Sequence, residues 1–148
     1  MKLQHRFAVP ASRDRVWATF KDLPVVAACV PGVDELVRLD ADRYSGRFGA
    51  GVGPIHLSLE GEVGLEILDD AAGRALLRAN GTDRRLGGGV RALVTLSVDP
   101  GEAGGTDVVI DSDVQVLGRI GELGQPIMKR KADEIMRAFA SRLAERLA

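Results

Sequence analysis

The sequence predicts an α+β fold in which a curved antiparallel sheet of about seven strands is covered by a long C-terminal helix. Apolar and polar side chains alternate from residue 55 to residue 67, as expected for a strand with one buried face. The same alternation returns in residues 74–82, 86–98 and 106–117, with turn-forming residues between these segments. Apolar residues then recur at helical spacing from Ile120 to Leu143. Strands flanked by helices in this order are typical of α+β proteins.

The N-terminal part of the chain predicts one strand followed by two short helices. Residues 3–9 alternate between apolar and polar side chains, which indicates a half-buried first strand. Ser12 is a suitable N-cap for a helix with one apolar face, formed by Val16, Trp17 and Phe20. A second short helix runs through Cys29, and Pro31-Gly32 ends it.

Two short strands, residues 35–39 and 44–52, are expected before the first long strand. Gly61 interrupts the apolar face of that long strand, where a glycine commonly marks a bulge or a bend and lets the strand curl. After residue 119 the period becomes helical through to the C-terminus. Pro126 lies within this segment and is expected either to kink the last helix or to mark its true start.

Composition excludes several classes of protein. With 148 residues the chain is expected to form one domain, residues 1–148. A net charge of −1 provides no field to attract nucleic acid. The single cysteine rules out an intramolecular disulfide framework and indicates a reducing compartment, most simply the cytoplasm. The N-terminus is too polar for a signal peptide and no apolar run could cross a bilayer, so membrane contact is expected to be at most peripheral, at the inner membrane face.

No set of catalytic or metal-binding residues can be assembled from the sequence. The two histidines, His5 and His56, lie on different predicted strands, and no zinc or iron site of usable spacing includes them. We interpret both as structural or surface residues, and Cys29 as a small core residue. The carboxylates of residues 60–62 and 111–113 lie on the solvent face of their strands, whereas acid–base catalysis requires an apolar cleft. We therefore expect no cofactor, no metal and no enzymatic activity.

Several motifs, taken together and in order, resemble a known family. They are Phe7-Ala8-Val9-Pro10-Ala11, Val16-Trp17, Cys29-Val30-Pro31-Gly32, Gly51-Val52-Gly53-Pro54-Ile55 and Val114-Gln115-Val116-Leu117-Gly118-Arg119-Ile120. Over essentially its whole length the chain is similar to the G subunit of carbon monoxide dehydrogenase, a branch of the START/Bet v 1-like (SRPBCC) superfamily. The Cys-x-Pro-Gly turn followed by Gly-x-Gly-Pro-Ile is the most specific part of this resemblance.

The resemblance implies a helix-grip fold, in which a seven-stranded curved antiparallel sheet, two short helices and a long C-terminal helix enclose an apolar cavity. It further implies a non-enzymatic protein that binds an apolar small molecule, a quinone or a lipid, and serves a molybdenum hydroxylase-type redox enzyme. Two alternatives remain open. One is an enzyme of the polyketide cyclase or hydratase type on the same fold, and the other is an assembly protein with an empty cavity.

The apolar faces of the predicted elements indicate which residues line such a cavity. Nearly all of them are aliphatic, which favours binding over catalysis because an enzyme would need a polar group directed into the cavity. The sheet and the last helix are expected to contribute Leu57, Leu59, Leu77, Ala92, Val94, Ile110, Ile127, Ile135 and Phe139. The second short helix is expected to contribute Val26, Ala27 and Val30 near the mouth of the cavity.

Overall fold

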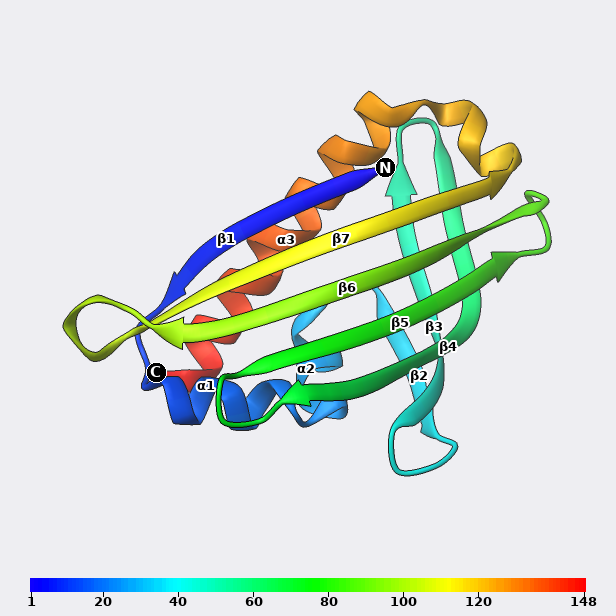
Figure 1. Cartoon of the computed structure of the whole chain (residues 1–148). Coiled ribbons are helices and arrows are strands. Elements are labelled where there is room, and N and C mark those ends of the chain that lie inside the picture. The colour runs from blue at the N-terminus through cyan, green and yellow to red at the C-terminus, as the bar shows by residue number, and fades with distance from the viewer.

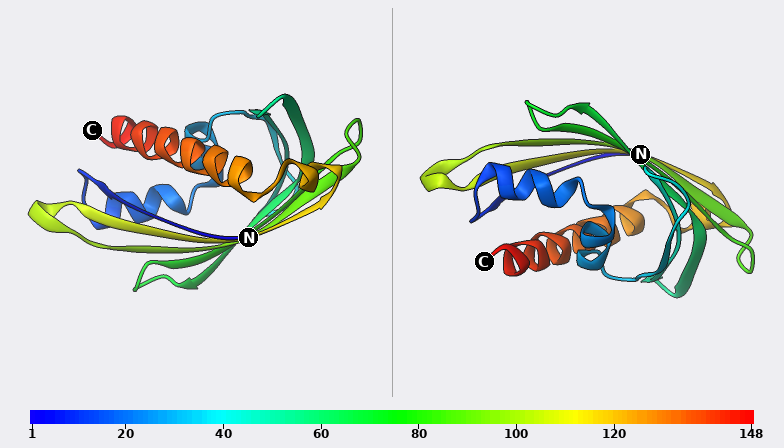
Figure 2. Two further views of the ribbon diagram at one scale, coloured as in Figure 1. Left: turned by 90° about the horizontal axis from the view of Figure 1, so that it is seen from above. Right: turned by 90° about the horizontal axis from the view of Figure 1, so that it is seen from below.

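The protein forms one seven-stranded antiparallel sheet with its helices on the concave side (Figures 1 and 2). The structure, a computed structural model, describes residues 1–148. The strands are β1 (Lys2–Val9), β2 (Val33–Arg38), β3 (Arg43–Val52), β4 (Ile55–Asp69), β5 (Arg74–Asp83), β6 (Gly88–Pro100) and β7 (Thr106–Gly118). The helices are α1 (Arg13–Phe20), α2 (Leu23–Cys29) and α3 (Gln125–Leu147), with short 3₁₀ segments η1 (Glu102–Gly104) and η2 (Arg119–Leu123). This order of elements confirms the predicted α+β architecture.

The strands follow the spatial order β1-β7-β6-β5-β4-β3-β2, so the first strand joins the sheet beside the last one. Consecutive strands from β2 to β7 pair as hairpins, and β1 pairs antiparallel with β7. Gly61 lies at a close approach of two strands, where a Cβ atom would overlap the carbonyl oxygen of Asn80 on β5. A glycine is required there, as the predicted bend in the long strand implies.

The last helix begins later than the helical period alone indicates. Residues 119–123 form η2, and α3 starts at Gln125 with Pro126 in its first turn. The missing N–H of a proline has no consequence at that position, because the first N–H groups of a helix have no intrahelical acceptor. Pro126 therefore marks the start of the helix and does not kink it.

All buried apolar residues except Leu3 and Leu23 belong to two separate clusters. The larger core cluster contains 14 buried residues, which come from α1, α2, the C-terminal half of α3, the strands β1, β5, β6 and β7, and the connection between β1 and α1. The smaller core cluster contains Ala50, Val52, Leu57 and Ile120, from β3, β4 and η2.

Asp83, at the end of β5, is a buried charged residue with a defined structural role. It is 2% exposed, and its carboxylate accepts hydrogen bonds from the N–H groups of Ser58 and Leu86 at 2.8 and 3.0 Å. These two backbone donors hold the pKa of Asp83 below its usual range. Asp83 thereby fixes the β5–β6 turn against β4.

We expect Asp83→Asn to lower the melting temperature at pH 7, because the amide NH₂ group would face one of two backbone donors. The folded-state pKa lies below the value of about 3.9 for an unfolded aspartate, so the carboxylate contributes its full stability above that pH. This contribution is lost as the pH falls through the folded-state pKa. Thermal melts from pH 7 to pH 2 should show the difference from wild type narrowing below about pH 4. Asp113→Asn, at an exposed carboxylate, is the control, and a constant difference across pH would contradict the role of Asp83.

Candidate functional site

A band of partly buried apolar side chains crosses the middle of the sheet face that is covered by the helices. The sheet register aligns Val63, Ala79, Ala92 and Val114 in one row across β4, β5, β6 and β7. These positions share the face of the buried residues Ala75, Leu96 and Ile110, because side chains two apart on a strand point to the same side. We call Val63, Leu77, Ala79, Ala92, Val114 and Ile135 of α3 the central band, since all six are partly buried and belong to neither core cluster.

The twelve predicted cavity residues divide into three groups by their packing. Three are buried in the core clusters, namely Leu57, Ile110 and Phe139. Five are partly buried and pack against a cluster, namely Val26, Val30 and Val94 on the larger one and Leu59 and Ile127 on the smaller one. Leu77, Ala92, Ile135 and Ala27 are partly buried and belong to neither cluster. Binding of a ligand by any of these residues remains a prediction.

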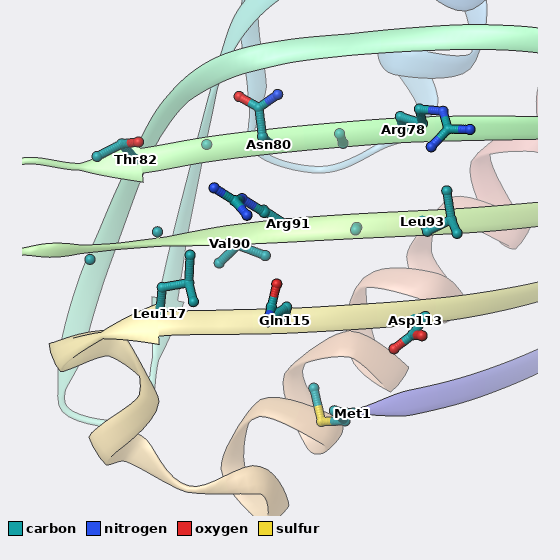
Figure 3. Close-up of a pocket in the computed structure, with 15 residues that line it drawn as sticks. Met1, Arg78, Asn80, Thr82, Val90, Arg91, Leu93, Asp113, Gln115 and Leu117 are labelled. Carbon is teal, nitrogen blue, oxygen red and sulfur yellow. The ribbon is translucent and has the colours of Figure 1, made fainter.

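A hollow lies on the opposite, outer face of the sheet (Figure 3). It has a volume of about 1000 Å³, and of the twelve predicted residues only Ala92 borders it. Figure 3 shows polar side chains of β5, β6 and β7 on this face, with α3 behind the sheet. Sequence reasoning assigned this face to solvent. The hollow depends on how the sheet twists and on which residues of neighbouring strands pair, and neither can be read from the period of a single strand.

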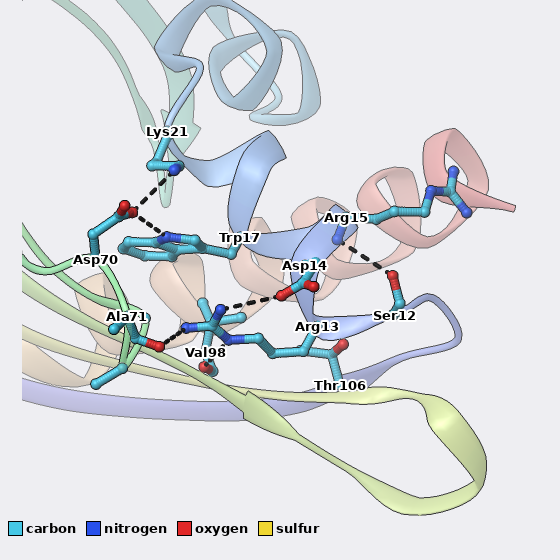
Figure 4. Close-up of polar contacts among 12 residues, drawn as sticks. Ser12, Arg13, Asp14, Arg15, Trp17, Lys21, Asp70, Ala71, Val98 and Thr106 are labelled. Carbon is cyan, nitrogen blue, oxygen red and sulfur yellow. Dashed lines mark hydrogen bonds and ion pairs between the residues drawn. The ribbon is translucent and has the colours of Figure 1, made fainter.

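Polar contacts made by α1 fix that helix against the β4–β5 turn (Figure 4). Trp17 is 4% exposed, and its Nε1 donates a hydrogen bond to Asp70 at 2.8 Å. Lys21 donates to the same carboxylate oxygen at 2.9 Å, and Arg13 donates to the carbonyl oxygen of Ala71 at 2.9 Å. The hydrogen bond from Trp17, followed by that from Lys21, lowers the pKa of Asp70. These contacts hold α1 over one end of the inner sheet face.

His5 on β1 forms a second polar link, to α3. Its Nε2 lies 2.7 Å from the carboxylate of Asp133, and this hydrogen bond lowers the pKa of Asp133. The other ring nitrogen, Nδ1, is enclosed and has no hydrogen-bond partner. A general base must reach the proton that it abstracts, and the packing around Nδ1 leaves no access to it. The pair therefore acts as a brace between the sheet and α3.

The remaining candidate residues for chemistry do not converge. Cys29 is 3% exposed within the larger core cluster, which confirms its interpretation as a small core residue. No group of three or more His, Cys, Asp or Glu side chains is placed to hold a metal ion. None of the helices is both long enough and apolar enough to cross a membrane.

A curved antiparallel sheet wrapped around a long C-terminal helix, with two short helices after the first strand, is the START/Bet v 1-like helix-grip fold. The family model of the carbon monoxide dehydrogenase G subunit (CoxG) matches residues 6–148. The chain belongs to the CoxG family, and both the resemblance and the fold predicted from the sequence are confirmed.

Solved structures with this fold are similar along the whole chain but distant in sequence. A conserved protein from Geobacillus kaustophilus has a TM-score of 0.88 at 16% identity, with coverage of 99% of this chain and 95% of that one. A START superfamily protein from Mycobacterium smegmatis has a TM-score of 0.72 at 15% identity, with coverage of 99% and 96%. The Zhui aromatase/cyclase from a Streptomyces species has a TM-score of 0.67 at 17% identity, with coverage of 100% and 96%. No match was found among curated protein sequences.

Proposed function

We propose that this protein is a non-enzymatic carrier that binds an apolar small molecule, a quinone or a lipid, between the inner sheet face and α3. The central band is the observation that supports this proposal. Its six side chains are apolar and only partly buried, whereas a solid core would bury them. Ala79 and Ala92 also border the hollow on the outer face. The smallest side chains of the central band, Ala79 and Ala92, are paired at the centre of the sheet.

Burial of the ligand would supply the binding energy. Each methylene group that moves from water into an apolar site contributes about 0.8 kcal/mol, before the cost of ordering the ligand. An isoprenoid or acyl chain carries many such groups, so a site with few polar partners can still hold it. The two core clusters at either side would keep the sheet and α3 in place while the ligand enters between them.

Membership of the CoxG family supports a partner of the molybdenum hydroxylase type, to which the bound molecule would be presented. We place this exchange in the cytoplasm, with contact at the inner membrane face that is at most peripheral. The alternative for a member of this family is an assembly role with an empty cavity. The binding experiments below distinguish the two roles.

Catalysis on this fold is known in the structural neighbours, which include an aromatase/cyclase and a norcoclaurine synthase. The inner face of the present chain offers little for such chemistry. Tyr44 of β3 lies opposite Val63 in the row of the central band, and Ser112 lies in the next row. No base is hydrogen-bonded to either hydroxyl group. A serine without an adjacent base is a weak nucleophile. The Nδ1 atom of His5 is enclosed.

We expect Ala92→Phe to weaken binding of decylubiquinone about tenfold or more, because the new ring would fill the space above the central band. Titration followed by tryptophan fluorescence or calorimetry measures the affinity, and thermal melting measures stability. Leu93→Phe is the matched control, since Leu93 is the next residue, points to the outer face and is 42% exposed. The control should bind decylubiquinone as the wild type does.

Native mass spectrometry of protein purified from its host would identify a ligand that copurifies. Quinone or lipid affinity that survives in a folded Ala92→Phe variant would contradict the proposed site. Reproducible turnover of a small polyketide-like substrate by the wild type would contradict the non-enzymatic role. Failure of the wild type to bind any quinone or lipid would favour the assembly role.

A further inference from the structure

The outer face of the sheet carries a positively charged hollow in a chain whose net charge is −1. Arg78 on β5 and Arg91 on β6 are its arginines, and Asp113 on β7 is its carboxylate. Asn80, Thr82 and Gln115 add amide and hydroxyl groups. Figure 3 shows these side chains on three adjacent strands of one face. We call this surface the outer groove; its exposed lining side chains are Arg78, Asn80, Thr82, Arg91, Leu93, Asp113, Gln115 and Leu117.

The two arginines of the outer groove differ from other arginines on the same face. Arg43 pairs with Glu62, Arg47 pairs with Glu60, and Arg74 pairs with Asp99. Arg78 and Arg91 form no ion pair and no side-chain hydrogen bond. The register places Asn80 opposite Arg91 and Leu93 opposite Arg78, so the arginines are diagonal neighbours on paired strands. Diagonal neighbours lie about 7–8 Å apart at the backbone, and both guanidinium groups can reach carboxylates of a single ligand.

Leucine side chains border these free charges. Leu93 is 42% exposed and Leu117 is 38% exposed, and both line the outer groove. Arginine beside exposed apolar side chains is typical of protein–protein interfaces, where arginine is enriched and provides much of the binding energy. A small molecule would be poorly enclosed here, because ligand pockets bury most of their ligand and the eight side chains that define the outer groove are all exposed.

We propose that the outer groove docks an acidic segment of a partner protein, with carboxylates on Arg78 and Arg91 and apolar side chains on Leu93 and Leu117. Positive charge on the groove and negative charge on the segment are complementary, which favours fast encounter and sets the register of docking. Ala79 and Ala92 of the central band also border the hollow, but Arg78, Arg91 and the two leucines point to the outer face, so docking on them does not require a ligand on the inner face.

The test uses a short fluorescein-labelled peptide of Glu-Leu-Gly repeats, with a Lys-Leu-Gly peptide as the reversed-charge probe. We expect saturable binding of the acidic peptide that weakens with salt, and changes in the NMR amide signals of residues 78–82, 90–93 and 115–117. The double variant Arg78→Glu/Arg91→Glu should lose about tenfold or more in affinity for the acidic peptide and should bind the basic one.

The control double variant is Arg6→Glu/Arg15→Glu, which changes the net charge equally at exposed arginines outside the groove. It should retain acidic-peptide binding. The proposal would be overturned if the acidic peptide showed no saturable binding or changed amide signals only outside the groove. It would also be overturned if the groove variant bound the acidic peptide as tightly as the wild type. Arginine-dependent binding of phosphatidylglycerol vesicles without peptide binding would replace it with a membrane surface. Sedimentation showing a dimer that the groove variant abolishes would replace it with a second copy of this chain.

Quinone titration of the same double variant separates this proposal from the proposed function. The groove variant should bind decylubiquinone as the wild type does, because its substitutions lie on the outer face of the sheet. Loss of peptide binding with retained quinone binding supports both proposals. A wild type that binds quinone but no acidic peptide overturns the docking proposal and leaves the carrier proposal intact.

Discussion

Trp17→Ala is expected to lower the free energy of unfolding by about 3–5 kcal/mol, the largest effect of any substitution proposed for this chain. The indole is 4% exposed within the larger core cluster, and its removal leaves a cavity below α1. Arg13 and Lys21 also lie 5.8 and 5.7 Å from the ring centroid, and their cation–π contacts would be lost. Urea denaturation at pH 7 measures the change.

The companion variant Trp17→Phe separates packing from the hydrogen bond to Asp70. It keeps an aromatic ring in the core but removes the Nε1 donor, so its cost should be nearer 1 kcal/mol. A Trp17→Ala protein that is as stable as the wild type but no longer binds decylubiquinone would instead make Trp17 a ligand-binding residue.

Much of the fold could be predicted because buried and exposed side chains alternate along the strands in step with the apolar and polar residues of the sequence. From Ile55 to Leu65 the apolar residues of β4 lie on the inner face, while Glu60 and Glu62 are exposed, as the alternation predicts. The pattern fails at Ile67, which is 39% exposed. The pairing of β4 with β5 shifts between Ile67 and Asp69, beside the turn, and a pattern within one strand contains no information about such a shift.

The depth of each side chain in the candidate site could not be predicted in the same way. Ala92 and Ile110 both belong to the inner face by their period, yet Ala92 is partly buried and Ile110 is buried in the larger core cluster. The degree of burial depends on which part of the sheet α1 and α3 cover, and tertiary packing decides where these helices lie. The outer groove was missed for a related reason, because Asn80 meets Arg91 only through the register of β5 with β6.

Gly32→Val is expected to be the second strongly destabilising substitution. Gly32 lies so close to the backbone of β3 that no larger residue fits there. Gly32 has a φ of +91° after Pro31, a conformation that side chains with a Cβ rarely adopt. A Cβ atom there would overlap the carbonyl oxygen of Gly49 on β3, and the Gly49 N–H donates to the Gly32 carbonyl at 2.9 Å. Backbone strain alone should cost about 1–3 kcal/mol. To avoid the overlap, the turn at residue 32 would have to move away from β3.

Gly51→Val provides the matched control on the same strand, β3. A Cβ atom at Gly51 has no neighbour within 4 Å, and its φ is not positive, so this variant should melt close to the wild-type temperature. Since Gly32 connects α2 to β2, its substitution should also displace Val26 and Val30 and weaken uptake of decylubiquinone. Thermal melting and quinone titration of both variants measure these effects. A Gly32→Val protein with unchanged melting temperature and unchanged quinone uptake would show that the turn has neither role.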